Sequence, residues 1–486
     1  MVKDKTYIPP YHETHPSETE GENRGLKNRH IQLIAIAGTI GTGLFMGAGK
    51  SISLTGPSIL LVYLFIGGLM FVLLRAIGSM LYMDPSQHSF LSFVFRYIGP
   101  RTGYFIQWTY WLVVIFMAMA ELTAIGSYLQ YWLPNVPLWV TEPLILVVLF
   151  GLNTLNAKFF GETEFWFGMI KIIAIGAMIL TAIILLVTHF DYNSVQHYTS
   201  TSTGKAVTMH AVGSASLSNI FSGFSLFPNG GMNFIASFQM VMFAFVAMEF
   251  IGMTAAETAN PRPTLKKAIH QIPYRILIFY IGALLAIMSI ITWHDIPADA
   301  SPFVMVFQLI GVTWAASLVN FVVLTSASSA LNSALFSTSR NLYSLSVSNG
   351  DKALKPFTKL SKNGIPLNAL IFTALLIFLT PFITLIPGVA NAFVAVTAIA
   401  TNLFLIVYVV TLITYLRYRR SPEFVGEVFK TPWILIPVTI VFFILIFLSL
   451  FFFKDTAGPA IGAVIWVIVF GLVSFFRKPA LETEKA

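Results

Sequence analysis

The sequence predicts an all-α polytopic membrane protein, and three observations support this prediction. Hydrophobic residues make up 56% of the 486-residue chain and charged residues only 10%, whereas soluble proteins contain about 25% charged residues. Twelve windows are apolar over about 20 residues, the length that spans a bilayer. Lys and Arg concentrate between alternate windows, as on the cytoplasmic side of membrane proteins.

The apolar windows follow one another along almost the whole chain. They cover residues 31–50, 57–80, 102–132, 138–155, 161–188, 233–256, 272–293, 304–345, 366–386, 390–416, 432–453 and 457–476. The third and eighth are longer than a bilayer needs, so we expect them to tilt or to extend beyond it. Residues 1–30 and 477–486 form polar tails, and residues 31–476 form one transmembrane domain.

The positive charges predict the orientation of the chain. An even number of spans places both termini on one side. With the N-terminus in the cytoplasm, cytoplasmic segments and span ends hold 25 of the 29 Lys and Arg residues; the exceptions are Lys50, Lys171, Lys205 and Lys454. Both termini are therefore predicted to be cytoplasmic. The net charge of +8 then reflects topology, and we expect no nucleic-acid partner.

Cysteine and histidine limit the possible chemistry. The chain has no cysteine, which excludes disulfides and thiolate metal sites. All nine histidines lie in tails, loops or span ends. We therefore expect no metal ion, no cofactor and no histidine proton relay within the membrane.

The first span, IAIAGTIGTGLFMGAG at residues 34–49, is rich in glycine. Each glycine destabilises a helix interior by about 1 kcal/mol relative to alanine, so the glycines need a reason. One explanation is a small-xxx-small face, Gly43-xxx-Gly47, that lets two helices approach closely. A phosphate-binding loop is excluded, because it needs a preceding strand in a soluble βα unit. The other explanation is a discontinuous helix whose free backbone groups bind a polar ligand.

The sixth span, residues 233–256, favours the discontinuous helix. It places Phe243, Phe245 and the carboxylate of Glu249 in mid-span. The first and sixth spans are five apart, so residues 31–188 and 233–416 can form two inverted halves, followed by two extra helices in 432–476. Interruptions at matching positions of two halves are the best sequence indication of a transporter's binding site.

Four segments carry a resemblance to a known family. They are GLKNRHIQLIAIAGTIGTGLFMGAGKSISLTGPS (25–58), FGETEFWFGMIKIIAI (160–175), FAFVAMEFIGMTAAETANP (243–261) and LTSASSALNSALFSTSRNLYSLS (324–346). Together they resemble the bacterial amino acid permeases of the amino acid–polyamine–organocation superfamily, over nearly the whole chain. Within it, LFMGAGKSISLTGPSI, GYFIQWTYW and VNFVVLTSASSALNSALFSTSR are most similar to permeases for serine, alanine and glycine, including the D-serine/D-alanine/glycine type.

The resemblance implies 12 transmembrane helices in a 5+5 inverted repeat, with helices one and six broken around the substrate. The expected substrate-binding residues are Thr39, Gly41, Thr42, Gly43, Phe243, Val246 and Ser329. The first glycine-rich turn would bind the substrate carboxylate through N–H groups, since a helix N-terminus attracts anions. The carbonyls of Thr39, Phe243 and Val246 would receive the α-ammonium, and the Phe243 ring would cover the substrate as a gate.

Two positions depart from the family pattern. The family often has glycine where this chain has Ala247, which would narrow the pocket. It often has glutamate at the end of helix two, where this chain has Ser79. A cytoplasmic carboxylate at that place is therefore not expected here.

Three ionisable side chains lie in mid-span and are expected to serve proton coupling: Lys171, Glu249 and Glu121. Burying such a group costs at least about 2.5 kcal/mol, so each is a functional candidate. Lys171 either snorkels to the cytoplasmic interface or is a fixed cation where related sodium-coupled transporters hold Na⁺, near the hydroxyls of Ser326, Ser328 and Ser329.

The two carboxylates leave alternatives open. Glu249 is expected either to accept hydrogen bonds from helix-one N–H groups or to accept the coupled proton. Glu121 is as well explained by a polar partner inside the bundle as by coupling. Glu257 is expected to bind local backbone or the Arg262 region, and Asn332 to lie near the pocket.

The leading hypothesis is proton-coupled uptake of small neutral amino acids by alternating access in the bacterial cytoplasmic membrane. Alternatives within the class are an amino acid exchanger, or a permease for aromatic, branched or cationic amino acids. Lys171 argues against sodium coupling. A membrane enzyme would need clustered nucleophiles, and a nutrient sensor a long cytoplasmic tail; neither pattern is present. The expected partners are substrate, protons and lipid, with the chain a monomer or weak homodimer.

Overall fold

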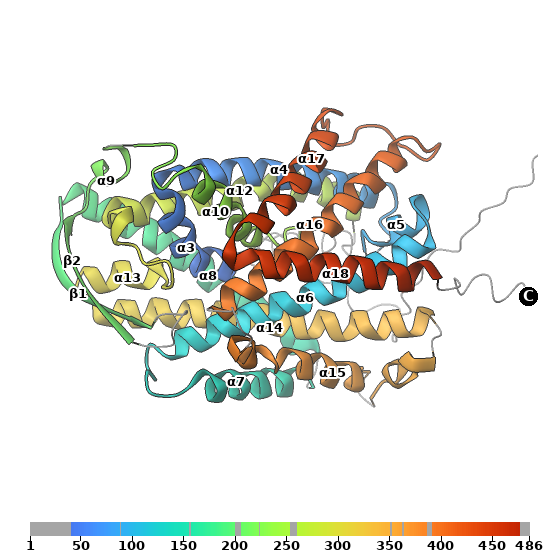
Figure 1. Cartoon of the computed structure of the whole chain (residues 1–486), viewed down its shortest axis with the longest axis horizontal. Helices are drawn as coiled ribbons and strands as arrows, with labels where there is room; N and C mark the ends of the chain where they lie inside the picture. The colour runs from blue at the N-terminus through green and yellow to red at the C-terminus, as the bar shows by residue number, and fades with distance from the viewer. Residues whose placement is uncertain are drawn as a thin grey trace, which may run out of the picture.

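Long apolar runs form the helices of the structure, and the longest of them lie roughly along one direction (Figure 1). The computed structural model describes residues 40–87, 89–154, 157–199, 206–222, 224–252, 260–349, 352–361, 364–385 and 391–476. A β-hairpin covers one end of the bundle, and the described chain ends at residue 476 at the other. These are called the hairpin end and the C-terminal end below.

The α-helices are α2 (Thr42–Phe45), α3 (Gly47–Thr55), α4 (Ile59–Met83), α5 (Ser92–Tyr97), α6 (Pro100–Leu129), α7 (Leu138–Asn153), α8 (Ala157–Val187), α9 (Ser218–Phe221), α10 (Gly231–Ala244), α12 (Pro261–Ile290), α13 (Pro302–Leu309), α14 (Thr313–Asn349), α15 (Leu367–Ile377), α16 (Ala392–Arg419), α17 (Leu435–Ser449) and α18 (Lys454–Phe476). Short 3₁₀ turns are η1 (Gly56–Ser58), η2 (Trp293–Asp295), η3 (Lys352–Thr358), η4 (Thr380–Leu385) and η5 (Leu450–Phe452).

Eight helices in the described part of the chain are long and apolar enough to cross a membrane. Three shorter apolar helices, α7, α10 and the α15 segment, accompany them. This confirms a helical, many-span membrane fold, while the count of twelve spans and the inverted repeat stay predictions. The expected eighth span, 304–345, is not one helix but two, α13 and α14. Gly311 between them has φ +74°, a conformation that ends a helix.

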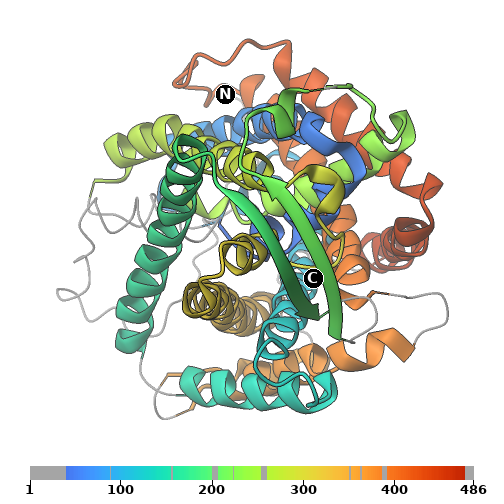
Figure 2. The ribbon, with the colours of Figure 1, turned by 90° about the vertical axis from the view of Figure 1, so that its left-hand side faces the viewer.

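The segment between the fifth and sixth expected spans contains a hairpin. Strand β1 (Asp191–Thr199) pairs antiparallel with β2 (Ala206–Ser214), with Asp191 opposite Ser214. Seen from the hairpin end, the two strands cross the bundle in front of the helices (Figure 2). The hairpin is anchored through β1, which packs on α13.

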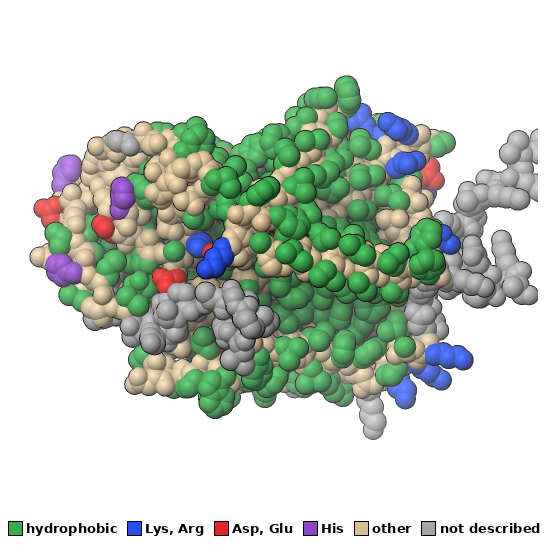
Figure 3. Space-filling view, in the orientation of Figure 1, with side chains coloured by type: hydrophobic (Ala, Val, Ile, Leu, Met, Phe, Trp, Pro, Cys, Tyr) green, Lys and Arg blue, Asp and Glu red, His purple; other side chains and the backbone are tan. Residues whose placement is uncertain are grey.

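Helix α6 lies at the centre of the bundle and packs against α14 and α16, while α4 packs on α12 and α10 packs on α3. The outer side of α18 is exposed and apolar, with Ile461, Ile465, Ile468 and Leu472 all at least half exposed. Hydrophobic side chains cover this flank, whereas Lys and Arg gather at the C-terminal end (Figure 3). Such a surface suits lipid contact along the flank and water at the ends.

Candidate functional site

Helix one begins at the predicted break. Gly41 is extended, with φ −133° and ψ −159°, and α2 starts at Thr42. The carbonyl of Gly41 accepts the first helical bonds, from Leu44 N at 3.1 Å and Phe45 N at 3.3 Å. Helical hydrogen bonding therefore does not pass through Gly41. Gly41 is also partly exposed, whereas residues 42–49 are buried, so solvent reaches the break. The expected carbonyl of Thr39 lies outside the described residues.

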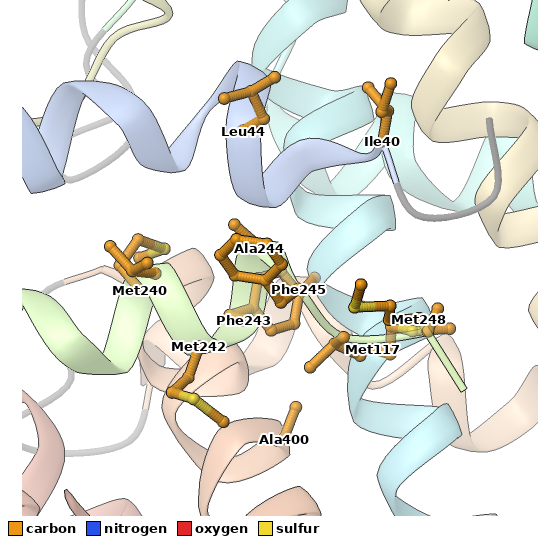
Figure 4. Close-up of a cluster of buried hydrophobic side chains, with 14 of the residues drawn as sticks. Ile40, Leu44, Met117, Met240, Met242, Phe243, Ala244, Phe245, Met248 and Ala400 are labelled. Atoms are coloured by element: carbon orange, nitrogen blue, oxygen red, sulfur yellow. The ribbon is translucent and has the colours of Figure 1, made fainter. Parts of the chain in front are cut away.

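Helix six is broken at the matching place. Helix α10 ends at Ala244, residues 245–249 form turns, and helical structure resumes at Phe250. Hydrogen bonds across the turns span three residues, such as Phe245 N to Met242 O at 3.1 Å. Ala247 has φ +70°, a left-handed conformation that favours glycine. This explains why relatives of the resembled family often carry glycine there. Figure 4 shows the break facing helix one.

The carbonyls released from helical bonding at this break differ in how far other groups satisfy them. The Tyr280 hydroxyl of α12 donates to Ala244 O at 2.7 Å. Phe243 O accepts from Val246 N at 3.1 Å and keeps one lone pair. Val246 O accepts no hydrogen bond from a described residue. Val246 is therefore the carbonyl best placed for a ligand, with Phe243 second.

Gly43 and Gly47 also provide the close approach that the small-xxx-small pattern predicts. A Cβ on Gly43 would lie 2.5 Å from Ala244 Cα, and one on Gly47 would lie 2.8 Å from Met240 Cγ and Sδ. Figure 4 shows α10 directly beside the helix that carries Leu44. The two explanations of the glycines thus hold together: Gly41 lies at the break, and the next two glycines let α2 and α3 pack on α10.

The hairpin end is closed by further contacts of helix one. Phe45 packs edge-on against Phe303 of α13, with ring centroids 4.8 Å apart. The Ser301 hydroxyl donates to Phe45 O at 2.7 Å. A Cβ on Gly49 would lie 2.5 Å from Ala300 O. Helix one and the segment leading into α13 therefore form one tightly packed unit.

Glu121 of α6 occupies the N-terminus of α2. Its Oε1 accepts from Thr42 Oγ1 at 3.1 Å, and the Thr42 N–H also donates to this carboxylate. A Cβ on Gly41 would lie 3.2 Å from the same Oε1. A carboxylate thus already binds the helix end predicted to bind anions. The other oxygen, Oε2, is buried and has no hydrogen-bond partner among the described residues.

Lys171 lies inside the bundle. It is 1% exposed, so it does not snorkel to the surface, and that alternative is wrong. Its charge interacts electrostatically with Glu121. Its helix, α8, packs on α14, and α14 contacts α2. The lysine and the carboxylate are therefore opposite charges of one buried site at the start of helix one.

Glu249 has hydrogen-bond partners that the sequence did not predict, and its role as a proton acceptor stays a prediction. Its Oε1 accepts from Tyr110 OH of α6 at 3.2 Å, and its Oε2 from Tyr408 OH of α16 at 2.9 Å. Among the described residues no N–H group of helix one donates to Glu249, whereas the Thr42 N–H donates to Glu121. Glu249 instead ties the broken helix six to α6 and α16. Sequence analysis missed both tyrosines, which differ from the other 15 tyrosines in no local pattern.

The remaining predicted residues surround these groups. Phe243 is buried, with its ring 6.3 Å from that of Phe393. Ser329 and Ser326 are buried on α14, and Ser326 Oγ has no hydrogen-bond partner in the described part of the chain. Asn332 accepts from Asn153 of α7 at 2.7 Å, so it joins two helices rather than lining the breaks. Glu257 lies outside the described residues.

Two features of the described chain bear on other chemistry. No three His, Cys, Asp or Glu side chains of the described residues lie close enough together to hold a metal ion. A further carboxylate missed by sequence analysis, Glu142 near the start of α7, is 1% exposed. It faces Gly126 of α6, where a Cβ would lie 2.8 Å from Glu142 Oε1. Its position at the edge of a predicted span hid it from the search for mid-span charges.

The helix start at Gly41 and the broken helix six, which meet beside a buried carboxylate and lysine, fit the arrangement that the resemblance implied, and comparison with known proteins agrees on the family. A family model described as "Amino acid permease" matches residues 30–477. The chain belongs to the amino acid permease family. This permease is 67% identical to the DL-alanine permease SerP2 of Lactococcus lactis subsp. cremoris (strain MG1363), over 95% of this chain and 97% of that protein.

Two further relatives are similar over nearly their whole length. The permease is 60% identical to the serine permease SerP1 of the same Lactococcus strain, over 94% of this chain and 97% of that protein. It is 40% identical to the D-serine/D-alanine/glycine transporter of Escherichia coli (strain K12), over 95% of this chain and 96% of that protein. These matches confirm the family that sequence analysis predicted.

Proposed function

We propose that this permease takes up small neutral amino acids together with a proton. The substrates are serine, alanine and glycine, with both enantiomers of the first two, as the names of its relatives suggest. The observation that carries the proposal is the Glu121 carboxylate on the N-terminus of α2, because substrate binding there must deal with a charge that is already present.

The substrate zwitterion binds mainly to backbone groups. Its carboxylate takes the N–H groups at Gly41, Thr42 and Gly43, where the α2 dipole favours an anion. Its ammonium takes the carbonyls of Val246 and Phe243, of which Val246 accepts no bond from described residues. Because backbone groups bind both charges of the substrate, no charged residue selects the substrate side chain. The buried apolar residues around the break therefore favour small neutral side chains.

Proton coupling follows from charge balance at the same helix end. Two carboxylates about 4 Å apart repel by roughly 4 kcal/mol at an effective dielectric constant of 20. A substrate carboxylate at Thr42 therefore favours a neutral, protonated Glu121. Lys171, which interacts with Glu121 in the free protein, then has the substrate carboxylate as its counter-ion. One proton and one substrate enter the site together. Lys171 then pairs with the substrate carboxylate, and the one added positive charge, on the substrate ammonium, is met by the carbonyls of Val246 and Phe243.

Alternating access uses the contacts on the two sides of the breaks. At the hairpin end, α2 and α3 are sealed against α10 and α13. Beyond the break of helix six, Glu249 holds the turn to Tyr110 and Tyr408. Opening of one side and closing of the other exchanges these contacts. The Phe243 ring, buried beside Phe393, covers the substrate between them.

The orientation proposed from sequence fits the charged ends. The described Lys and Arg residues outside the spans lie mostly at the C-terminal end (Figure 3), and Lys50 at the other end is neutralised by Asp455 at 3.2 Å. We place the C-terminal end and both termini in the cytoplasm and the hairpin end outside, because cytoplasmic loops carry the excess of Lys and Arg.

The experiment is uptake into proteoliposomes. Accumulation of radiolabelled L-serine or L-alanine is measured with an imposed inward proton gradient, with and without competing L- and D-serine, alanine, glycine and lysine. We expect proton-driven accumulation and competition by all but lysine. Strong competition by lysine with none by alanine would overturn the substrate class.

Two variants separate coupling from binding. Glu121→Gln keeps a neutral group at Thr42, so we expect it to retain counterflow exchange and to lose proton-driven accumulation. Lys171→Ala removes the counter-ion and is expected to lose proton-driven accumulation as well. Accumulation at the wild-type level in either variant contradicts the coupling scheme, while exchange without any proton dependence in the wild type indicates an exchanger.

A further inference from the structure

A pocket lies beside helix one, with walls that also come from β1 and α13 of the hairpin end. It has a volume of about 40 Å³, enough for a water molecule, which takes about 30 Å³ of liquid. Its walls come from the residue between α2 and α3, from α6 and the turn after it, from β1, from α13 and the segment before it, and from α14, and they carry no charge. The lining residues are Met46, Ser127, Tyr128, Tyr131, Tyr198, Ala300, Ser301, Val304, Met305, Gln308 and Asn320.

Among the residues that line the pocket, Tyr128 is the one that faces Glu121. The two residues are seven positions apart on α6, so they lie on one face of the helix about 10.5 Å apart along its axis. Long helical side chains lean toward the helix N-terminus, which directs the Tyr128 ring back toward Glu121. The hydroxyl interacts electrostatically with Glu121. Asn320 of α14 fixes this turn of the helix by donating to Tyr128 O at 2.8 Å.

The Tyr128 hydroxyl is buried and only weakly bound, by Ser301. The side chain is 2% exposed, and its oxygen has no hydrogen bond of normal length to a described residue. Ser301 lies beside it, but its own proton goes to Phe45 O at 2.7 Å. A buried hydroxyl without a partner costs about 1–3 kcal/mol, and a weakly bound one incurs part of this cost, which a phenylalanine would avoid. The closed conformation therefore does not explain why this position carries a hydroxyl.

We propose that Tyr128 relays the coupled proton from the pocket at the hairpin end to Glu121. A hydroxyl both donates and accepts. Water in the pocket that carries an excess proton from outside (H₃O⁺) gives it to Tyr128 Oη and is left as neutral water, while the hydroxyl passes its own proton toward the Glu121 carboxylate, directly or through one water. One O–H bond forms and one breaks at Oη, so the tyrosine stays neutral and Glu121 becomes a neutral acid.

The missing hydrogen bond makes the relay conditional. In the closed structure the hydroxyl makes no hydrogen bond to Glu121, and Glu121 is held by Thr42 and faces Lys171. Opening of the hairpin end moves α2 away from α13, which frees Ser301 from Phe45 and lets water reach both oxygens. Protons then enter only while the substrate can enter, so the gradient is not short-circuited. This inference rests on the proposed role of Glu121 and names its proton path.

The test compares Tyr128→Phe with wild type in proteoliposomes, by proton-driven uptake and by counterflow without a proton gradient. Removing a proton relay costs at least roughly tenfold where proton transfer limits the rate, so we expect at least a tenfold lower rate of proton-driven uptake and unchanged counterflow. The matched control is Tyr63→Phe, which removes another fully buried hydroxyl without a described partner but lies on α4; it should change neither rate.

Each outcome decides the matter. Wild-type proton-driven uptake in Tyr128→Phe overturns the relay and leaves the roles of Glu121 and Lys171 standing. Equal loss of uptake and counterflow also overturns it, because that pattern indicates a structural or substrate contact. Failure of the Glu121→Gln prediction would instead remove the coupling scheme, whatever Tyr128 does.

Discussion

Gly43 is the position where one added methyl group should change how the permease divides its time between conformations. A Cβ there would lie 2.5 Å from Ala244 Cα and 2.9 Å from Ala244 N. Ordinary contact begins near 3.4 Å, so α2 and α10 must separate by about 0.9 Å (3.4 − 2.5). Because backbone cannot rotate away, Gly43→Ala penalises the closed hairpin end by the 1–3 kcal/mol typical of overpacking, which is about 5–150-fold in population.

The assay uses the absence of native cysteine. A single cysteine in place of Val304, 6% exposed in the pocket wall, reacts with a membrane-impermeant maleimide only when the hairpin end opens. We expect Gly43→Ala to speed labelling from outside and to slow uptake.

Two glycine controls make the comparison specific. Gly47→Ala meets the flexible Met240 side chain and should have a smaller effect, while Gly176→Ala meets nothing within 4 Å and should have none. Unchanged labelling in folded Gly43→Ala protein, or an equal effect of Gly47→Ala, would refute the reasoning.

Three further predictions concern stability. Ala247→Gly relieves the φ of +70° and should raise the free energy of unfolding by about 1 kcal/mol; a lower thermal midpoint in detergent would contradict it. Tyr280→Phe leaves Ala244 O without its donor and should lower stability by about 1–3 kcal/mol and raise KM, so an unchanged midpoint and KM would count against it. At the C-terminal end, the Arg96 hydrogen bond lowers the pKa of Glu423. Its stabilisation, at most about 1 kcal/mol for such an exposed pair, should be present at neutral pH and vanish below about pH 4. The midpoints of wild type and Glu423→Gln should therefore converge at acid pH, and a constant difference would exclude this.

The sequence predicts the helices and the breaks well, because these depend on local composition. Gly41 and the 243–249 run are identified by residues that oppose a regular helix within a span. The glycine of the family pattern at position 247 also has a local cause, because φ +70° suits glycine better than the alanine present here. The family follows from motifs that extend over nearly the whole chain.

The partners of the buried charges could not be predicted, because they depend on how distant helices pack. Glu121 and Glu249 are both mid-span carboxylates, and nothing local tells which of them reaches helix one. The structure decides this by bringing Thr42 to Glu121, 79 residues away, and Tyr408 to Glu249, 159 residues away. For the same reason Tyr128 could not be distinguished from the other tyrosines until its neighbours were known.

Neighbouring residues at the start of helix one link the shape of the permease to its charge. Gly43 sets how closely α2 can approach α10, and Thr42, the preceding residue, donates to Glu121. Because α2 is a single turn, it cannot move away from α10 without moving Thr42 relative to α6. Opening the hairpin end should therefore release Glu121 from two donors at the moment when water, a proton and a substrate carboxylate can arrive. Coupling then needs no separate sensor, because α2 both closes the hairpin end and binds Glu121.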